Sequence, residues 1–252
     1  MSAEDDAALA ARLATEAGRL LLDVRREFAD VDARVRKDEG DRRSHELLAA
    51  ALADARPGDA LLSEEGADDS RRLSADRVWI VDPLDGTREF GQDGRSDWAV
   101  HVALWERGQL VSGAVALPAQ DITFSTGEPP TVPEAGPRLR LVVSRTRPPA
   151  LVEALAQALD ADLVPMGSAG AKAMSILQGL SDAYVHGGGM YEWDSAAPVA
   201  VARAAGLHAC RLDGSPLEYN RPDPLLPDLV ICRPGLVDVL LPAIAVAGNR
   251  SA

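Results

Sequence analysis

The sequence predicts two halves of different fold class, an α+β half at residues 1–137 and an α/β half at residues 138–252, within one compact unit. Three observations predict this division. Short apolar runs joined by turns fill residues 97–125, as in an antiparallel meander. Strand and helix patterns alternate after residue 138, which indicates a sheet covered by helices. Residues 127–137, between these regions, are rich in Pro and Gly, which is typical of a boundary.

The first half begins with two predicted helices. Apolar residues recur at helical spacing over residues 7–27. A second helix over residues 44–55 ends where Pro57 and Gly58 break it. The remaining elements are short apolar runs bounded by turn residues, so we predict strands. They cover residues 59–63, 78–81, 97–105, 110–117 and 122–125.

In the second half each short apolar run is followed by a segment with helical spacing. We predict strands at residues 139–143, 162–165, 182–186 and 229–232. The helices that follow them are predicted at residues 149–159, 169–179, 194–205 and 236–246.

The charge of the chain limits its partners. With 26 basic and 39 acidic residues the formal net charge is −13, which disfavours nucleic-acid binding through a basic surface. An anionic substrate would need local positive charge, for which bound metal ions are the natural source. No apolar run reaches the ~18 residues of a membrane span, and the first residues lack the pattern of a signal peptide. We therefore expect a soluble cytoplasmic protein without membrane contact.

The cysteines and histidines give no metal pattern. Cys210 and Cys232 are not in CxxC spacing and have no His pair beside them, which argues against a zinc site. Reduced, buried thiols are expected, although the sequence does not exclude a disulfide. The four scattered histidines are interpreted as packed or surface residues: His45, His101, His186 and His208.

Three acidic segments carry the chemistry. Asp82 and Asp85 stand at the mouth of a buried strand, where Pro83 and Gly86 bend the chain so that both carboxylates converge. Converging carboxylates without His or Cys favour Mg²⁺, Mn²⁺ or Ca²⁺. Upstream stand Glu64 and Glu65, and far downstream Asp194 precedes a helix rich in small residues. Taken singly, these segments also fit an acidic turn, a solvated helix start and an N-cap.

Taken together, in this order and spacing, the segments resemble the inositol monophosphatase superfamily over nearly the whole chain. The resemblance implies a layered αβαβα sandwich, with the site between the halves, and a Mg²⁺-dependent phosphatase. The string Asp-Pro-Leu-Asp-Gly-Thr-Arg-Glu-Phe at residues 82–90 is similar to CysQ-type 3′(2′),5′-bisphosphate nucleotidases. So are residues 144–148 and 167–172, while residues 193–198 are similar to the form of this segment in animal bisphosphate nucleotidases. Two departures are Arg147, in place of a frequent His, and Gly187, about where inositol monophosphatases carry an acid.

The resemblance also implies roles for single residues. The metal ligands would be Glu64, Asp82, the Leu84 carbonyl, Asp85 and Asp194, most of them from the first half. Asp41 and Thr87 would form a hydrogen-bonded pair that orients and deprotonates the attacking water, with Asp38 and Glu39 as competitors for the place of Asp41. Substrate contacts would come from Glu64, Leu84, Asp85, Gly86, Thr87, Ser144, Ser168, Lys172 and Asp194.

The activity that the resemblance implies is hydrolysis of 3′-phosphoadenosine 5′-phosphate to AMP and phosphate, linked to sulfate assimilation. Two or three Mg²⁺ ions would act, with Mn²⁺ as a substitute and Li⁺ or Ca²⁺ as inhibitors. The alternatives are hydrolysis of inositol-1-phosphate or fructose-1,6-bisphosphate, and a non-catalytic metal-binding regulator is disfavoured because all the acids are present. A homodimer is expected from the family alone.

Overall fold

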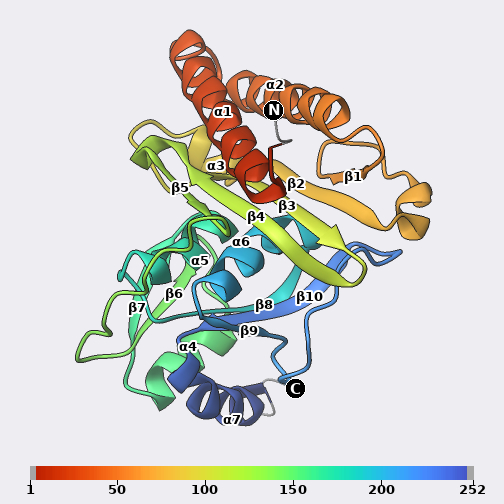
Figure 1. Ribbon diagram of the computed structural model, residues 1–252. Helices are drawn as coiled ribbons and strands as arrows, with labels where there is room; N and C mark the ends of the chain where they lie inside the picture. The colour runs from red at the N-terminus through yellow and green to blue at the C-terminus, as the bar shows by residue number, and fades with distance from the viewer. Residues whose placement is uncertain (1–3, 249–252) are drawn as a thin grey trace.

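The computed structural model describes residues 4–248. Its elements stack as helices, sheet, helices, sheet and helices, which confirms the predicted sandwich (Figure 1). Helices α1 and α2 form one outer layer, α5 and α6 the middle layer, and α4 and α7 the other outer layer. Their bounds are α1 Asp6–Glu27, α2 Ala33–Ala55, α4 Ala150–Ala158, α5 Ala169–Leu177, α6 Glu192–Ala204 and α7 Val237–Gly248.

The first sheet has the strand order β1-β2-β3-β4-β5, with β1 and β2 parallel and the later neighbours antiparallel, as a meander requires. Successive side chains of β2 point to opposite faces of the sheet and pack into two separate cores. Val78 and Ile80 pack toward the middle helices, whereas Trp79 and Val81 pack toward α1. The strands are β1 Ala60–Ser63, β2 Arg77–Asp85, β3 Ala99–Glu106, β4 Gln109–Leu117 and β5 Ile122–Ser125.

The second sheet has the order β7-β6-β8-β10-β9. Strand β6 runs parallel to β7 and β8, while β10 is antiparallel to β8 and β9. The strands are β6 Arg140–Ser144, β7 Asp162–Met166, β8 Ala183–Tyr191, β9 His208–Cys210 and β10 Leu225–Cys232. Short helical turns complete the chain at η1 Ser70–Ser74, α3 Thr87–Phe90, η2 Pro118–Gln120 and η3 Pro234–Leu236.

Small residues bring α6 close to the first sheet. A Cβ atom added to Gly113 on β4 would lie 2.8 Å from the Cβ of Ala200 and 3.4 Å from the carbonyl oxygen of Ala197. Only a glycine leaves room for the helix at this distance. The close approach places the first turn of α6 beside the end of β2, and these two elements carry Asp194 and Asp82.

Helix α2 begins eleven residues before its predicted start, since it runs from Ala33 rather than from Ser44. Asp32 caps it by accepting the N–H of Arg34 at 2.8 Å. Its first turns carry ion pairs, such as that between Arg42 and Glu39, in place of an apolar stripe. Apolar periodicity therefore could not detect this part of the helix.

Two strands continue beyond their predicted ends. β2 runs on through Pro83 to Asp85, where we had expected only a turn. β8 runs on through three glycines to Tyr191. Strand β9 was not predicted, because its three residues are too short to give a pattern.

Cys210 and Cys232 are buried and free, as expected. No helix among residues 4–248 is both long and apolar enough to cross a bilayer.

Candidate active site

The end of β2 holds Asp82 and Asp85, which are both buried. β2 pairs with β3 up to Asp82 and again at Asp85, and the residues between them bulge out of the ladder. Asp82 Oδ1 accepts the N–H of Leu84 at 3.0 Å. On α2, the Ser44 hydroxyl donates to the carbonyl of Pro83 at 2.7 Å. These bonds hold the bulge in place against α2.

Asp85 points at the N-terminus of α5, where several donors meet it. The Ser168 hydroxyl and the N–H of Gly170 donate to Oδ2 at 2.5 and 2.6 Å, and the N–H of Ala169 donates to Oδ1 at 3.1 Å. His101 Nε2 lies 3.2 Å from Oδ2. Burial raises the pKa of Asp85, but His101 and the donors outweigh it and lower the pKa to about 2. Asp85 is therefore held as an anion.

Asp194 comes from the first turn of α6, where its Oδ2 accepts the N–H of Tyr191 at 2.6 Å. One oxygen from each of Asp82, Asp85 and Asp194 lies within 4.8 Å of the others. Burial and the charge of Asp85 raise the pKa of Asp194 to about 6. Burial and the charge of Glu64 raise the pKa of Asp82 well above its usual value. A group of carboxylate oxygens that repel one another, with Asp82 and Asp85 buried and Asp194 partly buried, fits a hard divalent cation.

The other predicted ligands, Glu64 and the Leu84 carbonyl, lie at the edge of this group. Glu64 follows β1, is exposed, and stands outside the group of three acids. Although the side chain as a whole is exposed, lost hydration and the charge of Asp194 raise the pKa of its carboxyl to about 7. The Leu84 carbonyl accepts the Thr87 hydroxyl at 3.0 Å and keeps a second lone pair.

The predicted hydrogen bond between Asp41 and Thr87 is not formed within residues 4–248, because the Thr87 hydroxyl donates to Leu84 in its own turn. Asp41 lies on α2, upstream of the start that we predicted for this helix, and it is half-buried. Burial, followed by the charges of Glu65 and Glu64, raises its pKa to about 7. Asp41 therefore stands close to the acidic segment, but without the predicted partner.

A cavity of about 410 Å³ opens beside the acids. Asp85, Asp194 and Lys172 line it, together with Gly188 and other residues of β8. Lys172 is buried, and its ammonium lies 5.2 Å from the ring centroid of Tyr184. It forms no ion pair in the part of the chain that the structure describes. Burial lowers its pKa. The charges of Asp85, Glu89 and other nearby acids act in the opposite direction and favour the protonated form. A buried lysine that forms no ion pair is suited to a negatively charged substrate group.

Two more predicted substrate residues, Gly86 and Ser168, also line this cavity. Gly86 has a φ of 84°, and a Cβ added to it would lie 2.9 Å from that of Ser168, so only glycine fits. The Ser168 hydroxyl donates to Asp85 and accepts the N–H of Ala171 at 3.0 Å. Ser168 therefore caps α5 and orients Asp85 rather than offering a free donor to a nucleoside.

Ser144, a predicted substrate residue, is not among the residues that line this cavity, and neither is Gly187. Ser144 Oγ accepts the N–H of Arg147 at 3.4 Å in the turn after β6. His186, rather than its neighbour Gly187, lines the wall of the cavity.

Two of the segments that indicated the nucleotidase branch contact each other. Arg88 Nη1 donates to the Thr146 hydroxyl at 2.7 Å, and Arg145 Nη2 donates to Glu89 Oε1 at 2.8 Å. Arg88 and Glu89, which follow the acidic motif in the sequence, thus hold the turn that follows β6.

His101 belongs to the site, although the sequence suggested a packed or surface residue. It is fully buried, and its Nδ1 lies 3.0 Å from the Trp193 carbonyl, so Nδ1 carries a proton. Its Nε2 faces Asp85. His101 therefore joins β3, the end of β2 and the start of α6. The only sequence feature that could have assigned His101 to the site is its position as a single polar residue within an apolar strand. In the structure, His101 on β3 pairs with Asp82 on β2.

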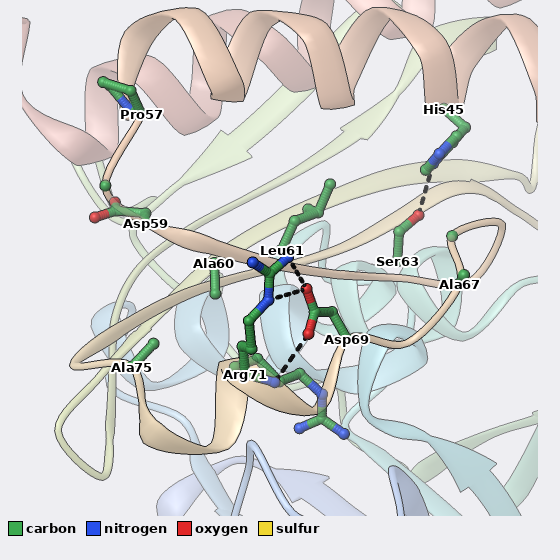
Figure 2. A pocket seen from close by; sticks show the side chains of 13 residues that line it. His45, Pro57, Asp59, Ala60, Leu61, Ser63, Ala67, Asp69, Arg71 and Ala75 are labelled. Carbon is green, nitrogen blue, oxygen red and sulfur yellow. Dashed lines mark hydrogen bonds and ion pairs between the residues drawn. The ribbon is translucent and has the colours of Figure 1, made fainter.

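A larger cavity, of about 630 Å³, lies between α2, β1 and η1 (Figure 2). At one end His45 Nδ1 lies 2.9 Å from the Ser63 hydroxyl, and at the other Arg71 pairs with Asp69. None of the three clustered acids lines it. Size alone therefore does not locate the chemistry, and we place the candidate active site in the smaller cavity.

Comparison with known proteins agrees with this geometry. The sequence pattern described as "Inositol monophosphatase family" matches residues 3–241. A Mycobacterium leprae protein named 3′-phosphoadenosine 5′-phosphate phosphatase is 52% identical over 255 residues, which cover 94% of this chain and 92% of that protein. The 3′(2′),5′-bisphosphate nucleotidase CysQ of Escherichia coli K12 is 32% identical over 190 residues, covering 70% and 76%.

The fold has solved counterparts. The crystal structure of CysQ from Bacteroides thetaiotaomicron, titled a bacterial member of the inositol monophosphatase family, superposes with a TM-score of 0.75 at 27% identity. The match covers 89% of this chain and 96% of that one.

We expect removal of divalent cations to lower the melting temperature, and to do so more at pH 8 than at pH 5.5. Glu64, Asp194 and Asp41 have folded pKa values of about 7, 6 and 7, above their unfolded values of about 4. The metal-free folded state therefore binds protons more tightly than the unfolded chain does. The stability that comes from this proton binding is lost as the pH rises through about 6 to 7. Calorimetry of chelated and Mg²⁺-loaded protein at both pH values measures the difference.

The predicted gap between the two melting-temperature losses is at least about 4 °C, or roughly 1–2 kcal/mol for a chain of this size. A loss that is equal at both pH values, or larger at pH 5.5, would contradict the repulsion between the acids.

The variant Asp85→Asn should lose at least about a thousandfold in phosphatase turnover, since several kcal/mol of charge stabilisation disappear. Its fold should survive, because the amide has nearly the same shape as the carboxylate. Turnover at saturating Mg²⁺ and far-ultraviolet circular dichroism test both statements. Asp121→Asn, at an exposed turn on the surface, is the matched control. Near wild-type turnover of Asp85→Asn would remove Asp85 from the site.

Proposed function

The chain belongs to the inositol monophosphatase family, and from this membership we propose that it hydrolyses the 3′-phosphate of 3′-phosphoadenosine 5′-phosphate. The products are AMP and phosphate. It is thus a phosphoric monoester hydrolase, a 3′(2′),5′-bisphosphate nucleotidase. The relatives named above, which match this chain over most of its length, support the assignment.

One observation carries the proposal within this chain. The cavity that holds Asp85 and Asp194 also holds Lys172, a buried cation without an ion-pair partner among the described residues. A substrate with two separate phosphates needs two places of positive charge. Cations at the acid group would take the reacting phosphate, and Lys172 would take the second one.

The acids suit Mg²⁺ as the resident cation. Asp82, Asp85 and Asp194 would hold it, with Glu64 and the Leu84 carbonyl completing the set. Bound Mg²⁺ supplies positive charge that offsets the negative charge on the attacking and leaving oxygens. Two or three ions, replacement by Mn²⁺, and inhibition by Li⁺ or Ca²⁺ are part of the proposal.

The remaining steps belong to side chains of the protein. Water attacks phosphorus, a new P–O bond forms, the bond to the ribose 3′-oxygen breaks, and this oxygen takes a proton from solvent water to become the 3′-hydroxyl of AMP. We assign acceptance of the water proton to Asp41, because a carboxyl with a pKa of about 7 accepts a proton readily at neutral pH. Thr87 would orient the water, and the backbone of Gly86 and Thr87 would contact the phosphate.

The alternatives differ in how they use Lys172. Fructose-1,6-bisphosphate also carries two phosphates and would use it, whereas inositol-1-phosphate carries only one. The link to sulfate assimilation, action in the cytoplasm, and a homodimeric state remain predictions from the resemblance.

The sharpest test compares 3′-phosphoadenosine 5′-phosphate with 3′-AMP, which lacks only the 5′-phosphate. The wild type should prefer the bisphosphate at least about a hundredfold in kcat/KM, which corresponds to roughly 2.7 kcal/mol. Lys172→Gln should lose most of this preference while hydrolysis of 3′-AMP changes little. Lys37→Gln, at the only other lysine, should keep the wild-type ratio. Inositol-1-phosphate and fructose-1,6-bisphosphate complete the comparison.

Two results would refute the proposal in different ways. A wild type that prefers fructose-1,6-bisphosphate or inositol-1-phosphate would overturn the substrate. A Lys172→Gln variant that keeps the full preference would place the second phosphate elsewhere in the cavity.

A further inference from the structure

Arg72 is a buried arginine that joins the two halves of the chain. It lies on η1, downstream of Glu64, and its side chain is 1% exposed, whereas that of its neighbour Arg71 is 89% exposed. Its Nη1 donates to Asn220 Oδ1 at 2.7 Å, and its Nη2 donates to the Arg221 carbonyl at 2.9 Å. Asn220 Nδ2 donates in return to the Arg72 carbonyl at 3.2 Å.

The guanidinium is held rigidly in this position. Its Nε and Nη2 donate to the two oxygens of Asp68 at 2.6 and 3.0 Å, four residues upstream. A planar group with this bidentate partner presents its remaining N–H groups in fixed directions. The side chain of Asn220 accepts one of these N–H groups. The backbone of Asn220 has a φ of 59°, a conformation that asparagine tolerates better than most residues.

The segment that Arg72 contacts is bonded in turn to the start of α6. The backbone N–H groups of Asn220 and Arg221 donate to the two carboxylate oxygens of Glu192 at 2.7 and 2.8 Å. Glu192 is the first residue of α6, and it is 1% exposed. Asp194 stands two residues further along the same turn.

A second bond from the same segment reaches the other side of Asp194. The Tyr219 hydroxyl lies 3.2 Å from the hydroxyl of Ser195, and both groups are buried. Glu192 and Ser195 therefore tie the residues before and after Asp194 to one segment. The segment therefore bonds to the turn of α6 that carries Asp194 on both sides of this residue.

We infer that Arg72 is a positioning residue: through Asn220 and Glu192 it sets the place of Asp194 relative to Asp82. Asp194 is the one acid of the group that the second half supplies, so its distance from the others depends on how the halves are joined. The inference rests on the proposed metal role of Asp194, but not on the identity of the substrate.

Direct metal binding tests this role without any substrate. In wild-type protein we expect Mn²⁺ binding by isothermal titration calorimetry. Arg72→Ala should weaken that binding about tenfold or more, as loss of groups that orient metal ligands does. Arg72→Lys, which keeps the charge but not the fork of donors, should recover only part of the affinity. Arg71→Ala, at the exposed neighbour, should bind Mn²⁺ like the wild type.

A second variant covers the case in which Arg72→Ala fails to fold. Asn220→Gly removes the amide group and suits the positive φ, so its backbone should stay in place. It should weaken Mn²⁺ binding in the same direction. The double variant should lose no more Mn²⁺ affinity than the single variant that binds more weakly, because both substitutions break the same chain of contacts. Additive losses of affinity would contradict the inference.

Catalysis offers an independent readout. At saturating Mn²⁺ the Arg72 and Asn220 variants should recover kcat, with the KM for the phosphate substrate unchanged. Variants with a lowered melting temperature but wild-type Mn²⁺ affinity well below that temperature would overturn the inference and leave Arg72 a structural residue. A wild type that binds no Mn²⁺ would overturn the metal-dependent function itself.

Discussion

The mutual repulsion of three clustered carboxylates, two of them buried and the third partly buried, is the constraint on which the structure depends. Oxygens of Asp82, Asp85 and Asp194 lie within 4.8 Å of one another, where little water screens them. Their surroundings shift the pKa values of the three carboxyl groups in different directions. The charge of His101, together with donors at the start of α5, lowers the pKa of Asp85 and keeps it ionised, while burial and neighbouring charge raise the pKa values of Asp82 and Asp194. A fold that brings like charges together in this way is suited to bind cations.

The middle layer of helices brings the acids together. Helix α5 points its N-terminal N–H groups at Asp85, and α6 begins at the same place with Asp194 in its first turn. Gly113 lets α6 lie close to the first sheet, and His101 contacts both the end of β2 and the start of α6. The outer helices contribute less directly, through Ser44 beneath the bulge. The site therefore depends on how two helices are held between two sheets.

The sequence predicted what local chemistry determines. The meander, the alternating second half, and Asp82, Asp85 and Asp194 followed from turn residues, apolar spacing and a resemblance among acidic segments. The sequence did not predict the features that only tertiary contacts determine. The start of α2 is stabilised by ion pairs rather than apolar spacing, and the continuation of β2 depends on pairing with β3. His101 and the hydroxyl of Ser168 face Asp85 from distant segments, so no local pattern could assign them to it.

Locating bound ions in crystals would show whether the three acids form one cation site to which both halves of the chain contribute. Crystals grown with Mn²⁺ and measured near the manganese absorption edge would show each ion as an anomalous peak. We expect at least one peak in contact with Asp82, Asp85 and Asp194 together. Peaks only at other acids, or none at saturating Mn²⁺, would contradict it.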